Sequence, residues 1–421
     1  MTANFSWLFV DRLIRTLGAL IASILVARYL GPADFGLLSY ALAYVALFNM
    51  LIDLGMGQIV VREAVRDQQE IRKILGTVYV LKLTGGILAI ALILVLLKVT
   101  YAEPLEAMVI LLTAGTLLFQ SFDNIDYFFQ SKVKSRNVAI SRSSAFLLAL
   151  GVKIWLIQMV CPVEYFAMAT LLEFMLVSAF LIISYQFSGY RILDWRFDRA
   201  WAGKLLEYSW PLAIAGFLST IHTRIDQVMI GNLLDSAEVG VYSIAIRLSE
   251  SWYFIPAVLA STLLPMFVKW RESNPEAYQR RLLWLYSLMF WMGAIAGVAV
   301  IFLGESLIEI LFGAAYSGAY TAFVLVIWNG IFVSQAVVRG MWLISENLQR
   351  YRLYNSMMAV MLNILANLWL IPRYGITGAA IATLLTQGLG TWVFSMLWKP
   401  MRESTLAMIR AINPVYLLQR P

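Results

Sequence analysis

Charged residues are scarce in this chain of 421 residues: they make up 14% of it, against about 25% in an average soluble domain. Hydrophobic residues make up 61%. A chain with so little charge and so much apolar surface is expected to be an integral membrane protein. Its apolar runs reach about eighteen residues or more and indicate helices, because the short alternating segments of a membrane β-barrel are absent.

Several kinds of chemistry lack the residues they need. The single cysteine, Cys161, excludes an intramolecular disulfide, and the single histidine, His222, excludes a metal site built from several histidines. ATP-driven pumping is excluded because the only Gly-Lys pair, Gly203-Lys204, is followed by Leu205 and completes no phosphate-binding loop. We therefore expect no catalytic residues, no bound metal, no cofactor and no nucleic-acid partner.

One pair of carboxylates keeps an enzymatic alternative open. Asp123 and Asp126 lie three residues apart, which is the nearest approach to the metal-binding carboxylates of a membrane glycosyltransferase. An enzyme that polymerises or ligates glycans would also need a large outer loop, and the longest one expected, at about residues 304–317, is short. The sequence therefore favours a transporter over an enzyme.

Twelve apolar segments are long enough to cross a membrane as helices. We place them at about residues 4–29, 37–60, 76–98, 105–130, 138–160, 165–187, 206–231, 238–267, 282–303, 318–345, 352–371 and 377–398. They predict an all-α membrane protein with four parts: an N-terminal lobe at 1–187, a linker at 188–205, a C-terminal lobe at 206–398 and a tail at 399–421. The first segment is expected to be an uncleaved signal anchor.

Two pairs of short similar runs in the sequence, here called echoes, relate the two lobes. Residues 33–36, Ala-Asp-Phe-Gly, are answered by Ala-Glu-Val-Gly at 237–240, an offset of 204 residues. The run Ala-Thr-Leu-Leu at 169–172 recurs at 382–385, an offset of 213 residues. Because both echoes come in the same order at nearly the same offset, they predict two six-helix lobes related by a parallel repeat.

The distribution of Lys and Arg predicts the orientation in the membrane. One set of loops and the tail carry 21 of them: Arg62, Arg66, Arg72, Lys73, Lys132, Lys134, Arg136, Arg191, Arg196, Arg199, Lys204, Lys269, Arg271, Arg280, Arg281, Arg350, Arg352, Lys399, Arg402, Arg410 and Arg420. The opposite loops carry only Arg28, Lys98 and Arg373. Loops rich in Lys and Arg stay in the cytoplasm, so both termini are expected there. The linker mixes aromatic and basic residues, as an amphipathic helix on an anionic leaflet would.

Eight basic residues remain inside the expected spans: Arg12, Arg15, Lys82, Arg142, Lys153, Arg224, Arg247 and Arg339. A charge facing lipid at the midplane would cost about 2.5 to 3.5 kcal/mol, so these residues are expected to face a protein interior or a water-filled lumen. There they are candidates to bind an anionic substrate. For the five nearest the cytoplasm, Arg12, Arg15, Lys82, Arg142 and Arg339, the alternative is that the side chain snorkels to the headgroups.

Arg224 and Arg247 do not suit snorkelling, because they lie in the outer halves of their spans, where few cations are expected. Arg224 lies seven residues and Arg247 nine residues from the hairpin at 231–238, so the two lie at a similar depth. They suggest an anion site or, alternatively, two ion pairs with Asp226 and Glu250.

Three acidic residues inside the spans are candidates for ion coupling: Asp53, Glu173 and Asp226. Protonation would remove most of the cost of burying such a carboxylate, and in the ionised form it could ligate sodium. For Glu173 the alternative is a structural hydrogen bond between helices.

Short segments from the first loop to the tenth span carry a resemblance to a known family. They are Arg28-Tyr29-Leu30-Gly31-Pro32 with Phe35-Gly36, Asp53-Leu54-Gly55, Arg224-Ile225-Asp226 with Ile230-Gly231, Val239-Gly240-Val241-Tyr242, and Leu311-Phe312-Gly313-Ala314-Ala315-Tyr316. In these segments the chain resembles the Wzx-type flippases of lipid-linked oligosaccharides. They form the polysaccharide-transporter branch of the multidrug/oligosaccharidyl-lipid/polysaccharide exporter superfamily.

The resemblance implies a MATE-like fold, in which two six-helix lobes enclose a cationic cavity that opens alternately to each side. The implied substrate is an undecaprenyl-diphosphate-linked oligosaccharide, a repeat unit of O-antigen, capsule or exopolysaccharide. It would move from the inner to the outer leaflet of the bacterial inner membrane, driven by an ion gradient. Membrane lipid is an implied partner, and a polysaccharide polymerase and a chain-length regulator are candidate protein partners.

The competing hypothesis is a multidrug/cation antiporter of the same fold. Its cationic substrates would favour a lumen rich in carboxylates. Away from the ends of the expected spans, the eight basic residues compare with seven acidic ones: Asp11, Asp53, Asp123, Asp126, Glu173, Asp226 and Glu250. This balance leans toward an anionic substrate.

Overall fold

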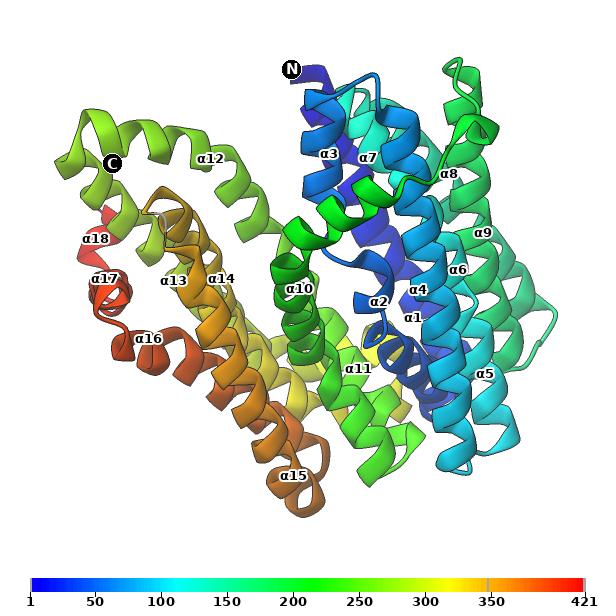
Figure 1. Cartoon of the computed structure of the whole chain (residues 1–421). Helices are drawn as coiled ribbons and strands as arrows, with labels where there is room; N and C mark the ends of the chain where they lie inside the picture. Colours follow the sequence, from blue (N-terminus) through cyan, green and yellow to red (C-terminus); the bar gives the residue numbers. More distant parts are fainter. Residues whose placement is uncertain (1, 347, 419–421) are drawn as a thin grey trace. The chain divides into compact units, whose positions relative to one another are not determined.

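The computed structural model describes residues 2–346 and 348–418, and every regular element in this part of the chain is a helix (Figure 1). The expected all-α class is confirmed. The contact pattern divides the chain into two compact units, with unit 1 ending at Ile225 and unit 2 starting at Asp226. This division falls inside one helix, α10 (Arg199–Leu233). The expected lobe boundaries stay a prediction.

Unit 1 contains nine helices before α10: α1 (Thr2–Ala46), α2 (Met50–Asp53), α3 (Gly57–Arg66), α4 (Ile71–Val99), α5 (Pro104–Ala114), α6 (Thr116–Phe119), α7 (Asn124–Ser131), α8 (Ser135–Gln158) and α9 (Val163–Phe187). The short 3-10 helices η1 (Gln120–Asp123) and η2 (Ile192–Asp194) lie between them. Several of the expected spans are therefore interrupted, and these interruptions carry polar side chains.

Two glycines set the interruptions in the first two spans. Gly31 has φ 71° and, with Pro32 after it, kinks α1 between its two limbs. Gly55 has φ 64° and follows Leu54, which is also left-handed, so the chain turns directly after Asp53. A Cβ on Gly55 would lie 2.4 Å from the backbone nitrogen of Ala213, so only glycine allows α10 to pack this closely.

The core of unit 1 lies where α3, α4, α7 and the linker meet. Phe128, Phe129 and Tyr185 are almost fully buried there. Tyr190, Ile192, Trp195 and Trp201 of the linker region pack against the same cluster. The expectation of one amphipathic helix for the linker is wrong: only Ile192–Asp194 form a short 3-10 turn, and α10 begins at Arg199. The linker aromatics pack on the protein instead of forming a helical stripe for the leaflet.

Unit 2 contains the rest of α10 and eight further helices: α11 (Ser236–Glu250), α12 (Phe254–Ser273), α13 (Pro275–Phe312), α14 (Ala319–Ser345), α15 (Gln349–Gly388), α16 (Phe394–Leu397), α17 (Arg402–Arg410) and α18 (Val415–Leu418). Three short elements, η3 (Ala314–Tyr316), η4 (Leu389–Val393) and η5 (Lys399–Met401), join them. Gly375 kinks α15, and η4 is a single π-helical turn between α15 and α16.

The tail helix α17 is part of the core of unit 2. Met401, Met408 and Ala411 are fully buried against Tyr286, Val338 and other residues of α13 and α14. Helix α17 therefore packs against the unit through its apolar side.

Eight segments of the described residues are long and apolar enough to cross a membrane. They overlap ten of the twelve expected spans, since two of them, Arg15–Arg66 and Arg350–Leu397, each overlap a pair. The other two expected spans, 206–231 and 238–267, lie outside this set. Helix α10 carries Lys204, Glu207, Arg224 and Asp226 among its residues, which lowers its apolar character. The chain is a multi-pass membrane protein, and the count of twelve spans stays a prediction.

Candidate functional site

A charge cluster forms in unit 1 around Arg142 of α8. Its guanidinium contacts Asp123 at 3.0 Å and Asp126 at 2.9 Å. The two carboxylates lie three residues apart, across the change from η1 to α7, so they face the same way and share one cation. The glycosyltransferase alternative would use Asp123 and Asp126 to bind a metal, whereas in the structure both carboxylates pair with Arg142.

Lys82 of α4 lies in the same neighbourhood, and its exposed fraction is only 2%. Its ammonium stands 5.2 Å from the centre of the Tyr127 ring, within range of a cation–π contact. Tyr127 in turn points its hydroxyl at Asp53, at 3.5 Å. The carboxylates of Asp53 and Asp123 and the Arg142 guanidinium interact electrostatically with Lys82. Lys82 forms no salt bridge within 4.0 Å among the described residues.

A second ion pair joins α8 and α9. The Lys153 ammonium lies 2.9 Å from a carboxylate oxygen of Glu173, and both side chains are less than a quarter exposed. An interhelical pair of this kind supports the structural alternative for Glu173. It also gives Lys153 a partner within the protein.

In unit 2, Asp226 of α10 is buried, and its carboxylate accepts three hydrogen bonds from neutral groups. Tyr242 of α11 donates over 2.9 Å, Asn367 of α15 donates over 2.6 Å, and Thr383 donates from beyond the kink of α15. Asn367 also donates to Asn363, one turn earlier, over 3.2 Å. The Asn367 carbonyl oxygen is buried without a hydrogen-bond partner among the described residues. The cluster thus gathers several oxygen atoms around one buried carboxylate.

Sequence reasoning named Asp226 but missed Tyr242, Asn363, Asn367 and Thr383. Two signals were present: the asparagines lie four residues apart within an apolar span, and Thr383 belongs to the second echo. The kink at Gly375 brings the two limbs of α15 to the same carboxylate, and a linear pattern does not show such a contact.

Arg339 of α14 is also buried, at 5% exposure, but its surroundings differ from those of a lumen. It donates to the backbone oxygen of Thr391 in the π turn over 2.6 Å, and to the Ser395 hydroxyl. Its other terminal nitrogen reaches Thr405 of the tail helix α17 at 3.2 Å. These acceptors are neutral and belong to the protein, so Arg339 ties the tail and the π turn to α14.

Arg15 and Arg224 are half-buried in unit 1, and Arg247 is half-buried in unit 2. Arg224 and Arg247 thus belong to different units, and their shared anion site stays a prediction. Arg12 lies outside the residues whose side chains the structure describes.

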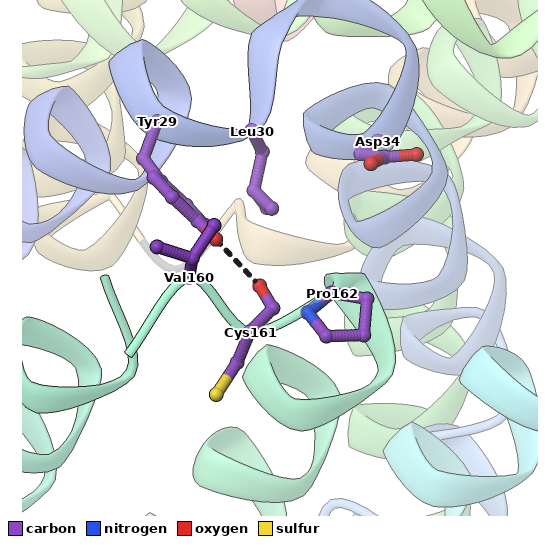
Figure 2. A pocket seen from close by; sticks show the side chains of 6 residues that line it. All are labelled: Tyr29, Leu30, Asp34, Val160, Cys161 and Pro162. Atoms are coloured by element: carbon purple, nitrogen blue, oxygen red, sulfur yellow. Dashed lines mark hydrogen bonds between the residues drawn. The ribbon is translucent and has the colours of Figure 1, made fainter. Parts of the chain in front are cut away.

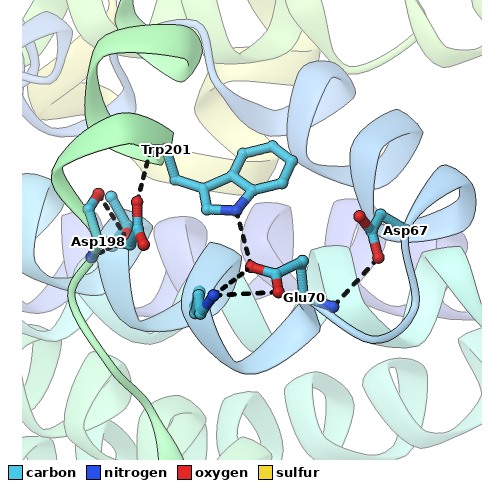
Figure 3. A network of polar contacts seen from close by, with 6 residues as sticks. Asp67, Glu70, Asp198 and Trp201 are labelled. Carbon is cyan, nitrogen blue, oxygen red and sulfur yellow. Dashed lines mark hydrogen bonds and ion pairs between the residues drawn. The ribbon is translucent and has the colours of Figure 1, made fainter.

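The linker is fastened to the helix ends of unit 1 by a polar network (Figure 3). The indole nitrogen of Trp201 donates to Glu70 over 3.2 Å, and the Lys73 ammonium lies 2.9 Å from the same carboxylate. These contacts to Lys73 and Trp201 hold the pKa of Glu70 below its usual value. The backbone nitrogen of Asp198 donates to the Thr77 hydroxyl over 2.9 Å. Behind this network, Lys204 contacts Glu63 at 2.7 Å.

A pocket of about 290 Å³ opens at the other end of unit 1, where the kink of α1 meets the turn between α8 and α9 (Figure 2). The Tyr29 hydroxyl donates to the backbone oxygen of Cys161 over 2.9 Å, and Asp34 lines the opposite side. This hydrogen bond joins the two turns. The pocket contains none of the candidate substrate-binding residues.

Proteins similar to this chain include two with related sequences. A capsular polysaccharide biosynthesis protein, CapF of Staphylococcus aureus, is 21% identical over 402 residues, which cover 92% of this chain and 96% of that protein. A probable low-salt glycan biosynthesis flippase, Agl15 of Haloferax volcanii, is 25% identical over 193 residues, covering 45% of this chain and 40% of that protein.

Two solved structures share the fold of this chain. One is the inward-facing conformation of a multidrug resistance MATE family transporter of the MOP superfamily, with a TM-score of 0.70, 15% identity, and 97% of this chain and all of that chain covered. The other is the lipid II flippase MurJ in an inward closed conformation, with a TM-score of 0.67, 15% identity, and all of this chain and 94% of that chain covered. These likenesses show that the MATE-like fold is present.

The family model described as polysaccharide biosynthesis protein matches residues 25–321. The match includes the charge cluster of unit 1 and the parts of α10 and α11 that hold Asp226 and Tyr242. Because it covers more than half of the chain, this chain belongs to the polysaccharide biosynthesis protein family.

Proposed function

We propose that this protein is a flippase that moves an undecaprenyl-diphosphate-linked oligosaccharide from the inner to the outer leaflet by alternating access. Its family membership supports this function, and the names of the two sequence relatives point to capsule and glycan assembly. The fold shared with MurJ is compatible with it. The glycan would be a repeat unit of O-antigen, capsule or exopolysaccharide.

The observation that carries the proposal is the buried Lys82 beside Arg142. An oligosaccharide on a lipid diphosphate can cross the hydrocarbon region only through a polar path, and its diphosphate needs cations along that path. Lys82 faces the Tyr127 ring, and Arg142 is shared between two carboxylates, Asp123 and Asp126. In the proposed mechanism the diphosphate takes the place of these carboxylates at Arg142 and gains Lys82 as a second cation.

The other basic candidates take different roles in this proposal. Arg15 would assist at the same cluster, and Arg224 of unit 1 and Arg247 of unit 2 would each be a candidate contact for the diphosphate before its outward release. Lys153 and Arg339 have partners within the protein and would contribute structure.

Ion coupling is proposed at the carboxylate of Asp226. Buried among hydroxyl and amide groups, it could bind a proton, or together with the oxygens of Asn363, Asn367 and Thr383 it could hold sodium. The side chain of Asp53 is exposed and faces the Tyr127 hydroxyl. In this proposal Asp53 would therefore respond to substrate bound near Tyr127. Glu173 would stabilise the packing of α8 against α9 through its ion pair with Lys153.

The proposed location is the bacterial inner membrane, with both termini in the cytoplasm. The bias of 21 to 3 basic residues between the two sets of loops supports this orientation. A polysaccharide polymerase and a chain-length regulator would receive the exported units on the outer side.

Reconstitution tests the function directly. The purified protein is placed in vesicles with a fluorescent short-chain oligosaccharide linked to a prenyl diphosphate, and the glycan reaching the opposite leaflet is measured with an impermeant glycosidase. We expect transfer that depends on the protein and falls in the Lys82→Gln variant. The exposed Lys98→Gln variant is the matched control. Absence of transfer, together with exchange of an organic cation for protons, would favour the antiporter instead.

A further inference from the structure

A groove lies between α8 and α9 at the end of unit 1 where the linker begins. Its lining residues are Asn137, Ile140, Ser141 and Ser144 of α8, with Phe180, Ile183, Ser184, Phe187 and Ser188 at α9 and its end. Its volume of about 460 Å³ is within the range of about 300–1,000 Å³ found for small-molecule sites. From Asn137 to Ser144 the groove extends about 10 Å along α8, a third of a hydrocarbon core of about 30 Å. It is therefore confined to one leaflet.

The lining combines tethered polar groups with exposed apolar side chains. The Ser141 hydroxyl donates to the backbone oxygen of Phe180 over 3.3 Å, and the Asn137 amide reaches the Ser188 hydroxyl at 3.5 Å. In contrast, Ile140 and Ile183 are each 45% exposed and Phe187 is 89% exposed. A hydrocarbon chain can therefore pack against the apolar residues, because the Asn137 amide and the Ser141 and Ser188 hydroxyls already have protein partners.

The end of the groove near Asn137 and Ser188 has charges of one sign. The two segments that flank it, residues 132–144 and 180–193, contain no Asp or Glu. They contain Lys132, Lys134, Arg136 and Arg191, and also Arg142, which is paired with Asp123 and Asp126 in the charge cluster. Arg136, which precedes Asn137, and Arg191, three residues after Ser188, are both exposed. This end of the groove is thus suited to an anionic headgroup.

We propose that this groove binds one anionic phospholipid of the leaflet next to the linker. Its phosphate lies at Arg136 and Arg191, and one acyl chain runs along Ile140, Phe180 and Ile183 toward Ser144. The bound lipid stays in its leaflet, since the groove ends about a third of the way through the hydrocarbon core. This site is separate from the glycan path around Lys82 and does not depend on the proposed flippase function.

Site-specific quenching tests the proposal in the full-length protein. In a Cys161→Ser background, which removes the single cysteine, Ser144→Cys carries a small fluorophore inside the groove. Leu148→Cys, four residues along α8 and 52% exposed, is the matched position outside it. The protein is placed in vesicles that contain brominated phosphatidylglycerol or brominated phosphatidylcholine at equal mole fractions. Ile183→Cys replaces Ser144→Cys if the latter fails to fold.

We expect the groove label to be quenched by phosphatidylglycerol at a several-fold lower mole fraction than by phosphatidylcholine, with no such preference at Leu148→Cys. Arg136→Gln and Arg191→Gln should each lower the preference by up to about fivefold, since each cation near an anionic surface contributes about that factor. Lys98→Gln should leave it unchanged. Equal quenching by the two lipids, or a preference that survives loss of both arginines, would overturn the proposal. Displacement of the phospholipid by undecaprenyl phosphate would also overturn it, by assigning the groove to the prenyl lipid.

Discussion

Lys82 is held among groups that tolerate its charge without forming a close ion pair. The Tyr127 ring faces its ammonium at 5.2 Å, and the carboxylates of Asp53 and Asp123 act on it from further away. Such an arrangement leaves the ammonium able to take a stronger partner, because no existing salt bridge has to break first. At the scale of single residues, Lys82 in unit 1 and Asp226 in unit 2 are the strongest candidates for function.

Replacing Lys82 with Gln is expected to lower glycan transfer by about tenfold or more. A charge-assisted hydrogen bond contributes about 1.5 to 3 kcal/mol, and that energy is lost with the charge. Lys82→Arg should keep part of the activity, because the charge remains although its shape changes. Transfer by reconstituted vesicles is the measurement, with Lys98→Gln as the control. Full activity of Lys82→Gln would exclude this lysine from the glycan path.

Replacing Asp226 with Asn is expected to remove the dependence of transport on sodium or pH, because the amide can neither take up a proton nor neutralise a cation. Tyr242→Phe, which removes one hydrogen bond to the same carboxylate, should cost about 1.5 to 3 kcal/mol of stability and keep the ion dependence. Transport is measured across sodium and pH gradients, with thermal unfolding as the check on folding. An unchanged ion dependence in Asp226→Asn would make this carboxylate structural.

At the scale of elements, the linker is fixed by close backbone packing as well as by side chains. A Cβ on Gly76 of α4 would lie 2.5 Å from the backbone nitrogen and 2.6 Å from the backbone oxygen of Arg196. The Arg196 nitrogen in turn donates to the backbone oxygen of Arg72 over 3.3 Å. The linker therefore lies directly on the first turns of α4.

Gly76→Ala is expected to displace the linker, because backbone atoms at these distances cannot give way cheaply. Gly151→Ala of α8 is the matched control, since a Cβ there meets no atom within 4 Å. Alanine should stabilise the control by about 0.5 to 1 kcal/mol through its higher helix propensity. Hydrogen exchange over residues 191–201 and thermal unfolding report the two effects. If both variants behaved alike, the close packing at Gly76 would be disproved.

The linker network also predicts a response to pH. The pKa of Glu70 is lowered by Lys73 and Trp201, so its carboxylate favours the docked linker above its ordinary pKa of about 4.3. That contribution is lost as the pH falls through the lowered value. Exchange protection of the linker should stay constant from about pH 7 to 5 and decrease below about pH 4. Glu70→Gln should lack this decrease, and a decrease of the same size in the variant would contradict the role of Glu70.

At the scale of the whole molecule, the loops divide into a set rich in Lys and Arg and a set with few of them. Loop residues at both ends are well placed to report on this division. Leu193 in the linker is 94% exposed, and Tyr101 in the turn between α4 and α5 is 91% exposed. Both positions can carry a cysteine without disturbing the core.

In a Cys161→Ser background, an impermeant thiol reagent applied to intact cells is expected to label Tyr101→Cys and to miss Leu193→Cys. The reason is that the basic loops stay in the cytoplasm. After the membrane is permeabilised, both positions should react. Efficient labelling of Leu193→Cys from outside would reverse the assigned orientation.

Much of the molecule could be inferred from composition and pattern alone. The all-α class follows because long apolar runs in a membrane must satisfy their own backbone hydrogen bonds. The family resemblance followed from segments such as Asp53-Leu54-Gly55 and Arg224-Ile225-Asp226, and the family match over residues 25–321 bears it out. The presence of charges within the spans could also be listed from the sequence.

Only the tertiary structure decided what those charges contact. Arg142 pairs with two carboxylates, Lys153 pairs with Glu173, and Arg339 donates to the tail helix. In the sequence, all three were simply basic residues inside the expected spans. The oxygens around Asp226 come from α10, α11 and both limbs of α15, up to 157 residues apart. Helical periodicity shows which residues share a face of one helix, whereas the partner across an interface depends on how several helices pack and kink.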